Sequence, residues 1–274
     1  MKIVSVDTGG TNTRIYDHKN SMAVFPTPWE YDAYVTFLKG NLSAYSPIDA
    51  LAVAVPAVVE NGIIRKIPNL SSSWKGRNLA QDLRDAVVDG GRILILSDIF
   101  AAGSAVKREE LDGHLPTLLV TLSTGVGAAL ITGQGVLSLE LGHLMLNLSG
   151  ENALCSCGQR GCVEADLSGR AIFRRTGVKP EKLEDAGFWS QYAWELGNFL
   201  LNMSVVFQLK QILLMGGISK QAKKFLPQAE RYLTANIKNM EKPLLGVSKL
   251  GDMAGVLGGY WLAEAFEAKL EKEP

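Results

Sequence analysis

Two glycine-rich turns of the same kind, far apart in the chain, constrain the fold most strongly. The first glycine turn, residues 7–11, is Asp-Thr-Gly-Gly-Thr and follows an apolar strand candidate at 2–6. The second glycine turn, residues 123–127, is Ser-Thr-Gly-Val-Gly, follows a strand candidate at 117–122, and begins 116 residues after the first. An extended segment comes after each turn, so each unit is predicted to be a β-hairpin with a glycine-rich bend. We expect two similarly built lobes facing each other across a cleft.

The rest of the chain alternates short apolar runs with longer amphipathic stretches, the pattern of an α/β protein. Further strands are predicted at 51–55, 93–96 and 211–215, and helices around 31–38, 189–200 and 254–269. We place a small N-terminal lobe at residues 1–107 and a large lobe at 108–254. The last helix, about 255–270, is expected to pack back onto the small lobe.

Composition excludes several classes of function. Of the 274 residues 47% are hydrophobic, and 28 basic residues balance 28 acidic ones. Nucleic-acid-binding proteins carry a clustered basic excess, which this chain lacks. No apolar stretch approaches the roughly 18 residues of a membrane helix, and Asp7 interrupts the N-terminal apolar run before a signal sequence could form. We therefore expect a soluble, cytoplasmic protein with no nucleic-acid and no membrane partner.

The glycine turns are candidate phosphate sites. Glycine lets successive backbone N–H groups point into one concavity, where they bind phosphate oxygens, and threonine adds hydroxyl donors. Neither a P-loop nor a Rossmann fingerprint is present. Either turn alone would more often be a structural bend, but two such turns, one preceded by an acid, favour phosphate. Asp7, at a strand end, can hold Mg²⁺ through water. The predicted donors are Gly9, Gly10, Thr11, Thr124 and Gly125.

Two further glycine pairs differ in what they predict. Gly216 and Gly217 follow the strand candidate at 211–215, where they would let a planar base or a ribose approach the backbone. A tight strand-to-helix turn is an equally good explanation for that pair. Gly258 and Gly259 lie inside the predicted last helix, where close helix packing explains them better.

Three cysteines within eight residues predict a metal site. Cys155, Cys157 and Cys162 can occupy three corners of a zinc tetrahedron, and His143, twelve residues upstream of Cys155, is the expected fourth ligand. The alternative is three buried free thiols. A site with four protein ligands is structural, because no open position remains for water. We expect this cysteine loop, residues 155–162, to hold Glu140 and Glu164 in place.

Taken in order, these pieces resemble the ROK family of sugar kinases, within the two-lobed actin-like (ribonuclease H-like) ATPase fold with mixed sheets. The resemblance extends from residue 3 to about residue 262, and its most specific part is Glu-x-Gly-His followed by Cys-x-Cys-Gly-x-x-Gly-Cys-x-Glu. Some family members are repressors with an N-terminal helix-turn-helix, which is not expected here because the first glycine turn begins at Asp7. The matching stretches are residues 7–14, Ser97 with Asp98, 122–127, 140–143 and 155–164.

The resemblance implies a mechanism. ATP with Mg²⁺ would place its phosphates on the two glycine turns and its nucleoside near Gly216 and Gly217, and Asp7 and Arg14 belong to the same cofactor site. Asp98 would be the general base that accepts the proton of a sugar hydroxyl. The other sugar ligands implied are Asn69, Glu140, His143 and Glu164. Local alternatives stay open: Asp98 or Glu164 could cap a helix, and Asn69 could build a turn.

One departure from the family pattern concerns the sugar pocket. The family has Asn-Asp-Ala-Asn-Ala-Ala around the base, whereas this chain has Ser-Asp-Ile-Phe-Ala-Ala. Ser97 thus replaces an asparagine that would contact a sugar hydroxyl, and its shorter side chain leaves room for water or a different substituent. Ser123 replaces the usual glycine in the second glycine turn, a milder change.

We therefore predict an ATP-dependent sugar kinase that phosphorylates a hexose, glucose at O6 being the expected substrate, and that forms a homodimer as family members often do. A kinase for N-acetylmannosamine, N-acetylglucosamine or fructose is the first alternative. A catalytically silent sugar-binding protein is the second, but the retained Asp7 and Asp98 argue against it. A zinc-stabilised interaction module would not explain two phosphate turns.

Overall fold

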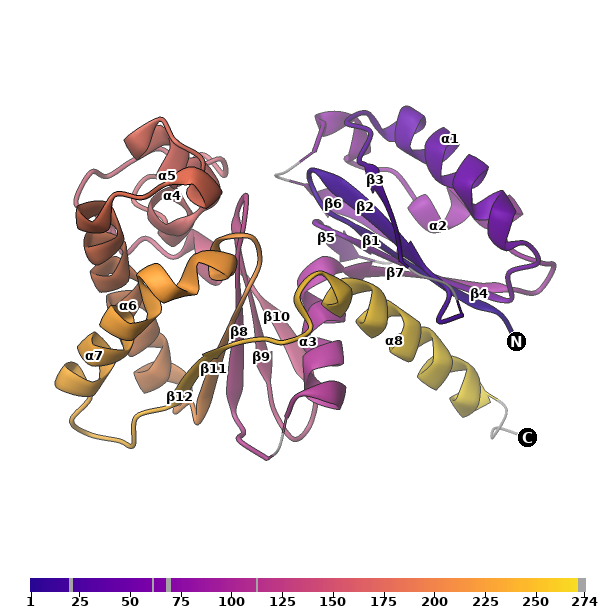
Figure 1. Cartoon of the computed structure of the whole chain (residues 1–274). Helices are drawn as coiled ribbons and strands as arrows, with labels where there is room; N and C mark the ends of the chain where they lie inside the picture. The colour runs from indigo at the N-terminus through magenta and orange to yellow at the C-terminus, as the bar shows by residue number, and fades with distance from the viewer. Residues whose placement is uncertain (20–21, 61, 68–69, 112, 271–274) are drawn as a thin grey trace. The chain divides into compact units, whose positions relative to one another are not determined.

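The chain forms two compact units, which a computed structural model describes (Figure 1). Unit 1 comprises residues 1–109 and 252–274, and unit 2 comprises residues 110–251. The structure describes residues 1–19, 22–60, 62–67, 70–111 and 113–270. Within these ranges, no helix is both long and apolar enough to cross a membrane.

Unit 1 is built on a mixed five-stranded sheet of order β3-β2-β1-β4-β7. The strands β1, β2 and β3 form an antiparallel meander, and β4 and β7 continue the sheet parallel to β1. The three strands predicted in this unit are confirmed with small shifts at their ends. The bounds are β1 Ile3–Thr8, β2 Asn12–Tyr16, β3 Ala23–Pro26, β4 Ala50–Val55 and β7 Arg92–Ser97, with a separate hairpin of β5 Val58–Glu60 and β6 Ile63–Lys66.

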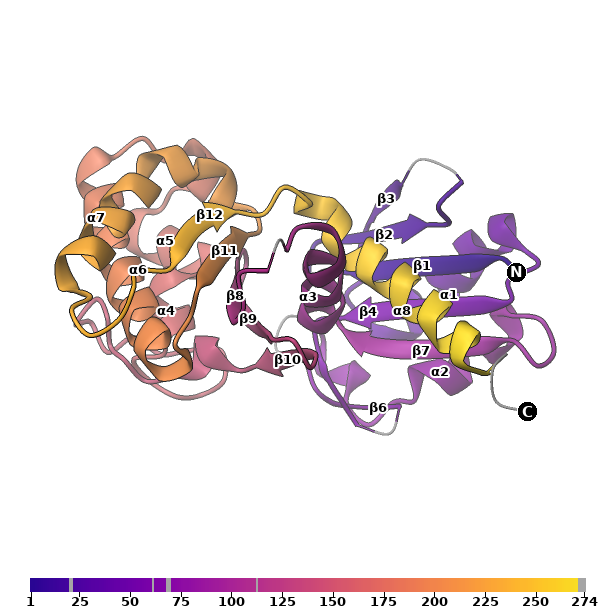
Figure 2. The same ribbon diagram turned by 90° about the horizontal axis from the view of Figure 1, so that it is seen from below.

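Helices cover both faces of this sheet, because alternate residues of its central strands are apolar on each side. Val4 and Val6 of β1 belong to a core with the buried face of α1, whereas Ile3 packs with Ala263 of α8 on the opposite face. Figures 1 and 2 show α8 lying along β1 and β4. The helices of this unit are α1 Tyr31–Leu42, α2 Leu79–Asp82, α3 Asp98–Glu109 and α8 Ala254–Leu270.

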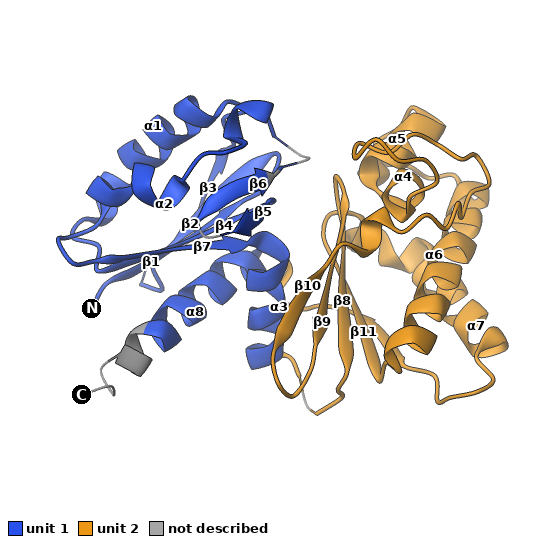
Figure 3. Ribbon diagram, turned by 180° about the vertical axis from the view of Figure 1, so that it is seen from behind, with its two compact units in different colours: residues 1–109, 252–274 blue, residues 110–251 orange. Residues whose placement is uncertain are grey.

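Unit 2 repeats the same topology with a sheet of order β10-β9-β8-β11-β12 (Figures 1 and 3). Here too the first three strands are antiparallel and the last two run parallel to β8. The prediction of two similarly built hairpins is therefore confirmed. The bounds are β8 Thr117–Leu122, β9 Val126–Ile131, β10 Val136–Leu139, β11 Gln211–Met215 and β12 Leu244–Val247, with α4 Val163–Leu167, α5 Gly169–Thr176, α6 Ala186–Phe207 and α7 Leu226–Asn236.

One face of this second sheet packs against a large apolar core. The buried face of α6, including Trp189, Tyr192 and Leu196, meets Leu118 and Val120 of β8 in that core. Short 3₁₀ helices occur in both units. They lie at Ser43–Tyr45, Ser72–Trp74, Arg84–Ala86, Leu141–His143, Pro180–Lys182, Ile218–Lys224 and Gly251–Met253.

The close packing predicted for Gly258 and Gly259 is confirmed. A Cβ on Gly258 would collide with the carbonyl oxygen of Ala101 in α3, and a Cβ on Gly259 would collide with Oγ of Ser5 in β1. Helix α8 therefore reaches the sheet only because these positions have no side chain.

Gly258→Ala should destabilise the protein by about 3 kcal/mol, because backbone of α3 must move to admit the methyl group. Urea unfolding followed by circular dichroism measures this loss. The matched control is Gly40→Ala in the last turn of α1, where an added Cβ meets nothing within 4 Å. That change should stabilise the protein by up to about 1 kcal/mol, since alanine favours the helix. Equal effects of the two substitutions would contradict the packing argument.

Candidate functional site

The first glycine turn is a tight bend between β1 and β2, and hydrogen bonds from the backbone and from a neighbouring side chain hold it in place. The Gly9 N–H donates to the Asn12 carbonyl over 2.8 Å, and the Thr27 hydroxyl donates to the Gly9 carbonyl over 2.8 Å. The buried Thr8 hydroxyl shares a 2.6 Å hydrogen bond with the Tyr34 hydroxyl. The Gly9 amide is thus used within the turn, and the next two predicted donors, Gly10 and Thr11, form its tip.

Asp7 and Arg14, both assigned to the cofactor site, lie together beside this turn. One guanidinium nitrogen of Arg14 is 3.4 Å from Asp7 Oδ2, and another is 3.0 Å from Oδ1 of Asp252. The backbone of Gly255 in α8 lies directly against the Asp7 carboxyl group, where a Cβ would collide with it. The Asp7 side chain is 15% exposed, and burial raises its pKa to about 6 although Arg14 opposes that shift.

Because the pKa of Asp7 is raised, ionisation of its carboxyl group should lower the stability of the folded state in a pH-dependent way. Between about pH 4 and pH 6 the folded state holds a proton that the unfolded state has lost, so stability falls as pH rises through this window. Above pH 6 the carboxyl group is ionised in both states, and the loss of folding free energy reaches its full value, about 3 kcal/mol at most. Asp7→Asn should therefore be more stable than the unmodified protein at pH 8 and nearly equal to it at pH 4, as measured by thermal unfolding. A difference that does not change with pH would contradict this account.

Ser97 and Asp98 lie at the same edge of the sheet as Asp7. Registers pair Asp7 with Ala54 of β4, and Ala54 with Leu96 of β7, so the carboxyl ends of the three parallel strands coincide. Asp7 is therefore two strand spacings, about 10 Å, from Leu96, and Asp98 follows Leu96 by two residues. Asp98 begins α3, and its Oδ1 accepts the Ile99 N–H over 2.7 Å. Asp98 is thus the first residue of α3, and its carboxylate bonds the next amide of the helix.

Of the predicted sugar ligands, Asn69 lies outside the described residues. Within unit 1, the structure therefore brings Asp7, Arg14, Ser97 and Asp98 and the first glycine turn to one edge of one sheet. This is the arrangement in which ligands of open α/β sheets bind, at the carboxyl ends of parallel strands.

The second glycine turn joins β8 to β9 and has Gly216 beside it. Ser123 donates its N–H to the Gly125 carbonyl over 3.0 Å, while Ser123 and Thr124 are exposed at the tip. A Cβ on Gly216, whose φ is +95°, would lie 2.5 Å from the Leu122 carbonyl oxygen. Glycine is thus required there by backbone conformation and by close approach. Gly217 is exposed next to it.

The four predicted metal ligands come together in unit 2. The ligand atoms of His143, Cys155, Cys157 and Cys162 all lie within 4.8 Å of one another. The Sγ atoms of Cys157 and Cys162 are 3.8 Å apart, and Cys155 Sγ is 3.7 Å from His143 Nδ1. A zinc tetrahedron with bonds of about 2.3 Å has edges of about 3.8 Å, whereas a disulfide requires about 2.05 Å. The donor set and its spacing therefore fit a four-coordinate zinc ion.

His143 presents its other ring nitrogen to Glu140. The His143 Nε2 is 3.7 Å from Glu140 Oε2, and the Glu140 side chain is 68% exposed. A histidine whose Nδ1 binds a metal keeps Nε2 for a second partner, here the carboxylate or a ligand that reaches it. The cysteine spacing assigns His143 to the metal and the resemblance assigns it to the sugar, and the sugar contact would then fall to Nε2.

Glu164 differs from Glu140 in being only 6% exposed. Its Oε2 accepts the Val126 N–H over 3.0 Å, and its Oε1 accepts the Ser156 hydroxyl over 2.9 Å. Glu164 does not cap α4, because no side chain that the structure describes caps the start of that helix and the Glu164 carboxylate bonds the second glycine turn and the cysteine loop instead. A carboxylate has about four acceptor positions, so Glu164 can still accept a hydrogen bond from a ligand.

Sequence reasoning missed several residues of these clusters, among them Thr27 and Tyr34 at the first glycine turn. Asp252 and Gly255 contact the Arg14–Asp7 pair from the start of the last helix, more than 230 residues along the chain. Ser156 contacts Glu164 across the cysteine loop. Of these residues, only Ser156 could have been suspected from the sequence, because its hydroxyl lies between two predicted metal ligands.

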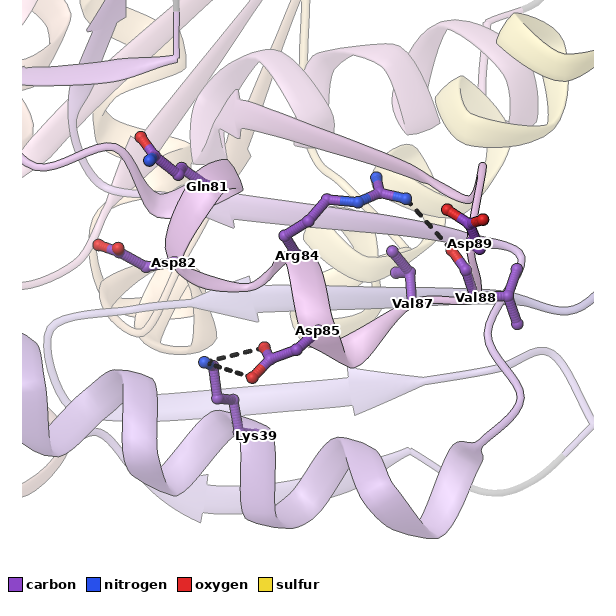
Figure 4. A pocket seen from close by; sticks show the side chains of 8 residues that line it. All are labelled: Lys39, Gln81, Asp82, Arg84, Asp85, Val87, Val88 and Asp89. Carbon is purple, nitrogen blue, oxygen red and sulfur yellow. Dashed lines mark hydrogen bonds and ion pairs between the residues drawn. The ribbon is translucent and has the colours of Figure 1, made fainter.

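A pocket of about 630 Å³ lies elsewhere in unit 1 (Figure 4). The two basic side chains that line it already have partners: the Lys39 ammonium is 2.8 Å from Asp85, and Arg84 donates to the Val88 carbonyl over 3.1 Å. Among the predicted site residues that the structure describes, none is one of the eight that line this pocket. We therefore assign it no part in the site.

The chain is similar to known proteins along almost its whole length. The family model described as the ROK family matches residues 4–265. The chain is 29% identical over 294 residues to the N-acetylmannosamine kinase of Vibrio vulnificus strain CMCP6, covering 100% of this chain and 89% of that protein. It is 25% identical over 328 residues to the glucokinase of Halalkalibacterium halodurans, covering 98% and 97%.

The fold is also that of a solved structure. The ROK family glucokinase from Streptomyces griseus, in complex with glucose and AMPPNP, superimposes with a TM-score of 0.80 at 21% identity, covering 97% of this chain and 100% of that one.

Proposed function

The chain belongs to the ROK family and has the fold of its sugar kinases, and on that premise we propose that it transfers the γ-phosphoryl group of ATP to a hexose hydroxyl. Glucose, at O6, is the substrate that we expect. The observation that carries this proposal is the edge of the unit 1 sheet, where a glycine turn, Asp7 and Asp98 lie at the ends of parallel strands. Similarity to a glucokinase, and to a ROK glucokinase that binds glucose and AMPPNP, supports the choice of sugar and nucleotide.

In the proposed reaction Asp98 acts as the general base. Its carboxylate accepts the proton of the sugar hydroxyl while the hydroxyl oxygen forms a bond to the γ-phosphorus. The bond from that phosphorus to the β,γ-bridging oxygen breaks, and ADP leaves with the electron pair. Backbone N–H groups of the two glycine turns would bind the phosphate oxygens, with Gly216 and Gly217 next to the nucleoside. Mg²⁺, held through water by Asp7, would neutralise phosphate charge.

The sugar hydroxyls are assigned to carboxylates and an imidazole. Glu140, Glu164 and His143 Nε2 would bind them in unit 2, and Ser97 and Asn69 would complete the set. One carboxylate can accept hydrogen bonds from two neighbouring hydroxyls, which suits the vicinal diol of a hexose. The cysteine loop would hold a structural Zn²⁺, which fixes the orientation of His143.

N-acetylmannosamine is the second candidate substrate. The relative with 29% identity bears that name, and Ser97 is shorter than the asparagine of the family pattern. A short side chain beside the base leaves room for a bulkier ring substituent. The two candidates differ at C2, where glucose carries a hydroxyl and N-acetylmannosamine an acetamido group.

The test is an ADP-release assay with Mg²⁺-ATP across a panel of glucose, mannose, fructose, N-acetylglucosamine and N-acetylmannosamine. We expect glucose to give the highest kcat/KM, and product analysis to locate the phosphate on O6. A higher kcat/KM for N-acetylmannosamine would replace glucose with the second candidate. If calorimetry detected binding of a sugar that stimulated no ADP release, the protein would be a silent sugar-binding protein instead.

A further inference from the structure

A chain of two hydrogen bonds joins the cysteine loop to the second glycine turn. Ser156 donates its hydroxyl to Glu164 Oε1 over 2.9 Å, and Val126 donates its N–H to Glu164 Oε2 over 3.0 Å. The Glu164 carboxylate is buried, and its bond from Val126 is buried with it, whereas the bond from Ser156 is partly buried. Bonds to a charged acceptor are strong where bulk water is kept away. A single side chain thus connects two segments about 30 residues apart.

The position of Ser156 is set by the cysteine loop. It lies between Cys155 and Cys157, two of the proposed metal ligands, so its backbone has little freedom once those thiols are fixed. Cys155 Sγ is itself 3.9 Å from Glu164 Oε1, so the carboxylate lies immediately outside the ligand cluster. Groups that contact metal ligands orient those ligands, and small displacements of such groups have measurable effects.

The second glycine turn is held in place by contacts with several neighbouring residues. Gly142 packs so tightly against the Val126 carbonyl that a Cβ would collide with it. The Gly169 N–H donates to the Ser123 carbonyl over 2.7 Å, and the side chain of Arg170 donates to the Thr124 carbonyl over 3.3 Å. Glu164 is the acidic residue among these contacts, and it binds the turn at the Val126 N–H while it also binds the cysteine loop. Small rotations of its carboxylate therefore alter the direction of the Val126 amide and its neighbours.

We propose that Ser156 is a positioning residue for nucleotide binding: it fixes the Glu164 carboxylate, and Glu164 fixes the second glycine turn. This rests on the proposed function in so far as the turn binds nucleotide phosphates. The cysteine loop then does more than orient His143 toward the sugar, because it also sets the geometry of the phosphate site. Nucleotide affinity should accordingly depend on a hydroxyl that touches no nucleotide.

The experiment compares Ser156→Ala, Ser156→Thr and the matched control Arg160→Ala. Ser156 is exposed, so a threonine methyl group can point to solvent while the hydroxyl is kept. Arg160 lies in the same loop and donates to the Asn152 carbonyl over 3.4 Å. The readouts are the Kd of Mg²⁺-AMPPNP by calorimetry, hydrogen exchange of the peptide that contains residues 123–127, and zinc content by mass spectrometry.

We expect Ser156→Ala to raise the Kd about three- to tenfold and to speed exchange in the second glycine turn, with zinc content unchanged. Ser156→Thr and Arg160→Ala should match the unmodified protein in all three readouts. Unchanged exchange and affinity in Ser156→Ala would overturn the proposal, as would a loss of zinc in that variant, because the effect would then pass through the metal. If no variant and not even the unmodified protein bound AMPPNP, the proposed function would fail, while the exchange rates would still decide whether Ser156 holds the turn.

Discussion

Asp98→Asn should lower kcat for sugar phosphorylation by about 10²–10⁴-fold, the contribution of a positioned general base. An asparagine amide keeps the size of the carboxylate but cannot accept the proton that leaves the sugar hydroxyl. Sugar affinity should change little, because the amide oxygen still accepts a hydrogen bond from that hydroxyl. Steady-state ADP release gives kcat, and calorimetry without nucleotide gives the Kd for the sugar.

The same substitution also separates catalysis from folding. Asp98 is the first residue of α3 and accepts the Ile99 N–H, and the amide oxygen of asparagine can accept the same hydrogen bond. Asp98→Asn should therefore unfold within a few degrees of the unmodified protein, whereas Asp98→Ala loses that bond and should lose about 1 kcal/mol in addition to activity. A kcat near normal in the folded asparagine variant would remove Asp98 from the role of base.

Much of the scaffold could be predicted because its signals are local. Each glycine turn follows a continuous buried apolar run, and β8 and β11 have the predicted bounds. The strands that sequence reasoning missed include β3, β10 and β12, which are four residues long, lie at or next to sheet edges, and are buried on neither face. Short edge strands carry little apolar alternation, so periodicity gives them no clear signal.

The contacts that complete the clusters could not be predicted in the same way. Asp252 and Gly255 meet the Arg14–Asp7 pair only because α8 packs onto the N-terminal sheet. The two roles of Glu164, near a predicted metal site and on a glycine turn, depend on tertiary placement of α4 against β9. Spacing in the sequence identifies which chemistry a segment carries, but which groups share a hydrogen bond is decided by packing.

Cys162→Ser should remove the metal and destabilise unit 2. Cys162 is fully buried, and its Sγ lies 3.8 Å from that of Cys157. A serine hydroxyl is a far weaker zinc ligand than a thiolate, so a purified variant should contain little zinc, against about one ion per chain in the unmodified protein. Because binding of a structural zinc ion contributes directly to folding, we expect a loss of more than about 4 kcal/mol.

Removing and restoring the metal distinguishes the loss of a metal ligand from the other effects of the substitution. All three cysteines of the chain belong to the cluster, so the matched control is the unmodified protein stripped with a chelator. Stripping should lower its unfolding temperature to near that of Cys162→Ser, and added Zn²⁺ should restore only the unmodified protein. The cysteine loop has little regular structure and a small apolar cluster of its own, so without the ion it has few contacts to replace the four ligand bonds. Equal stability with and without metal would instead mean that the three thiols pack as ordinary buried side chains.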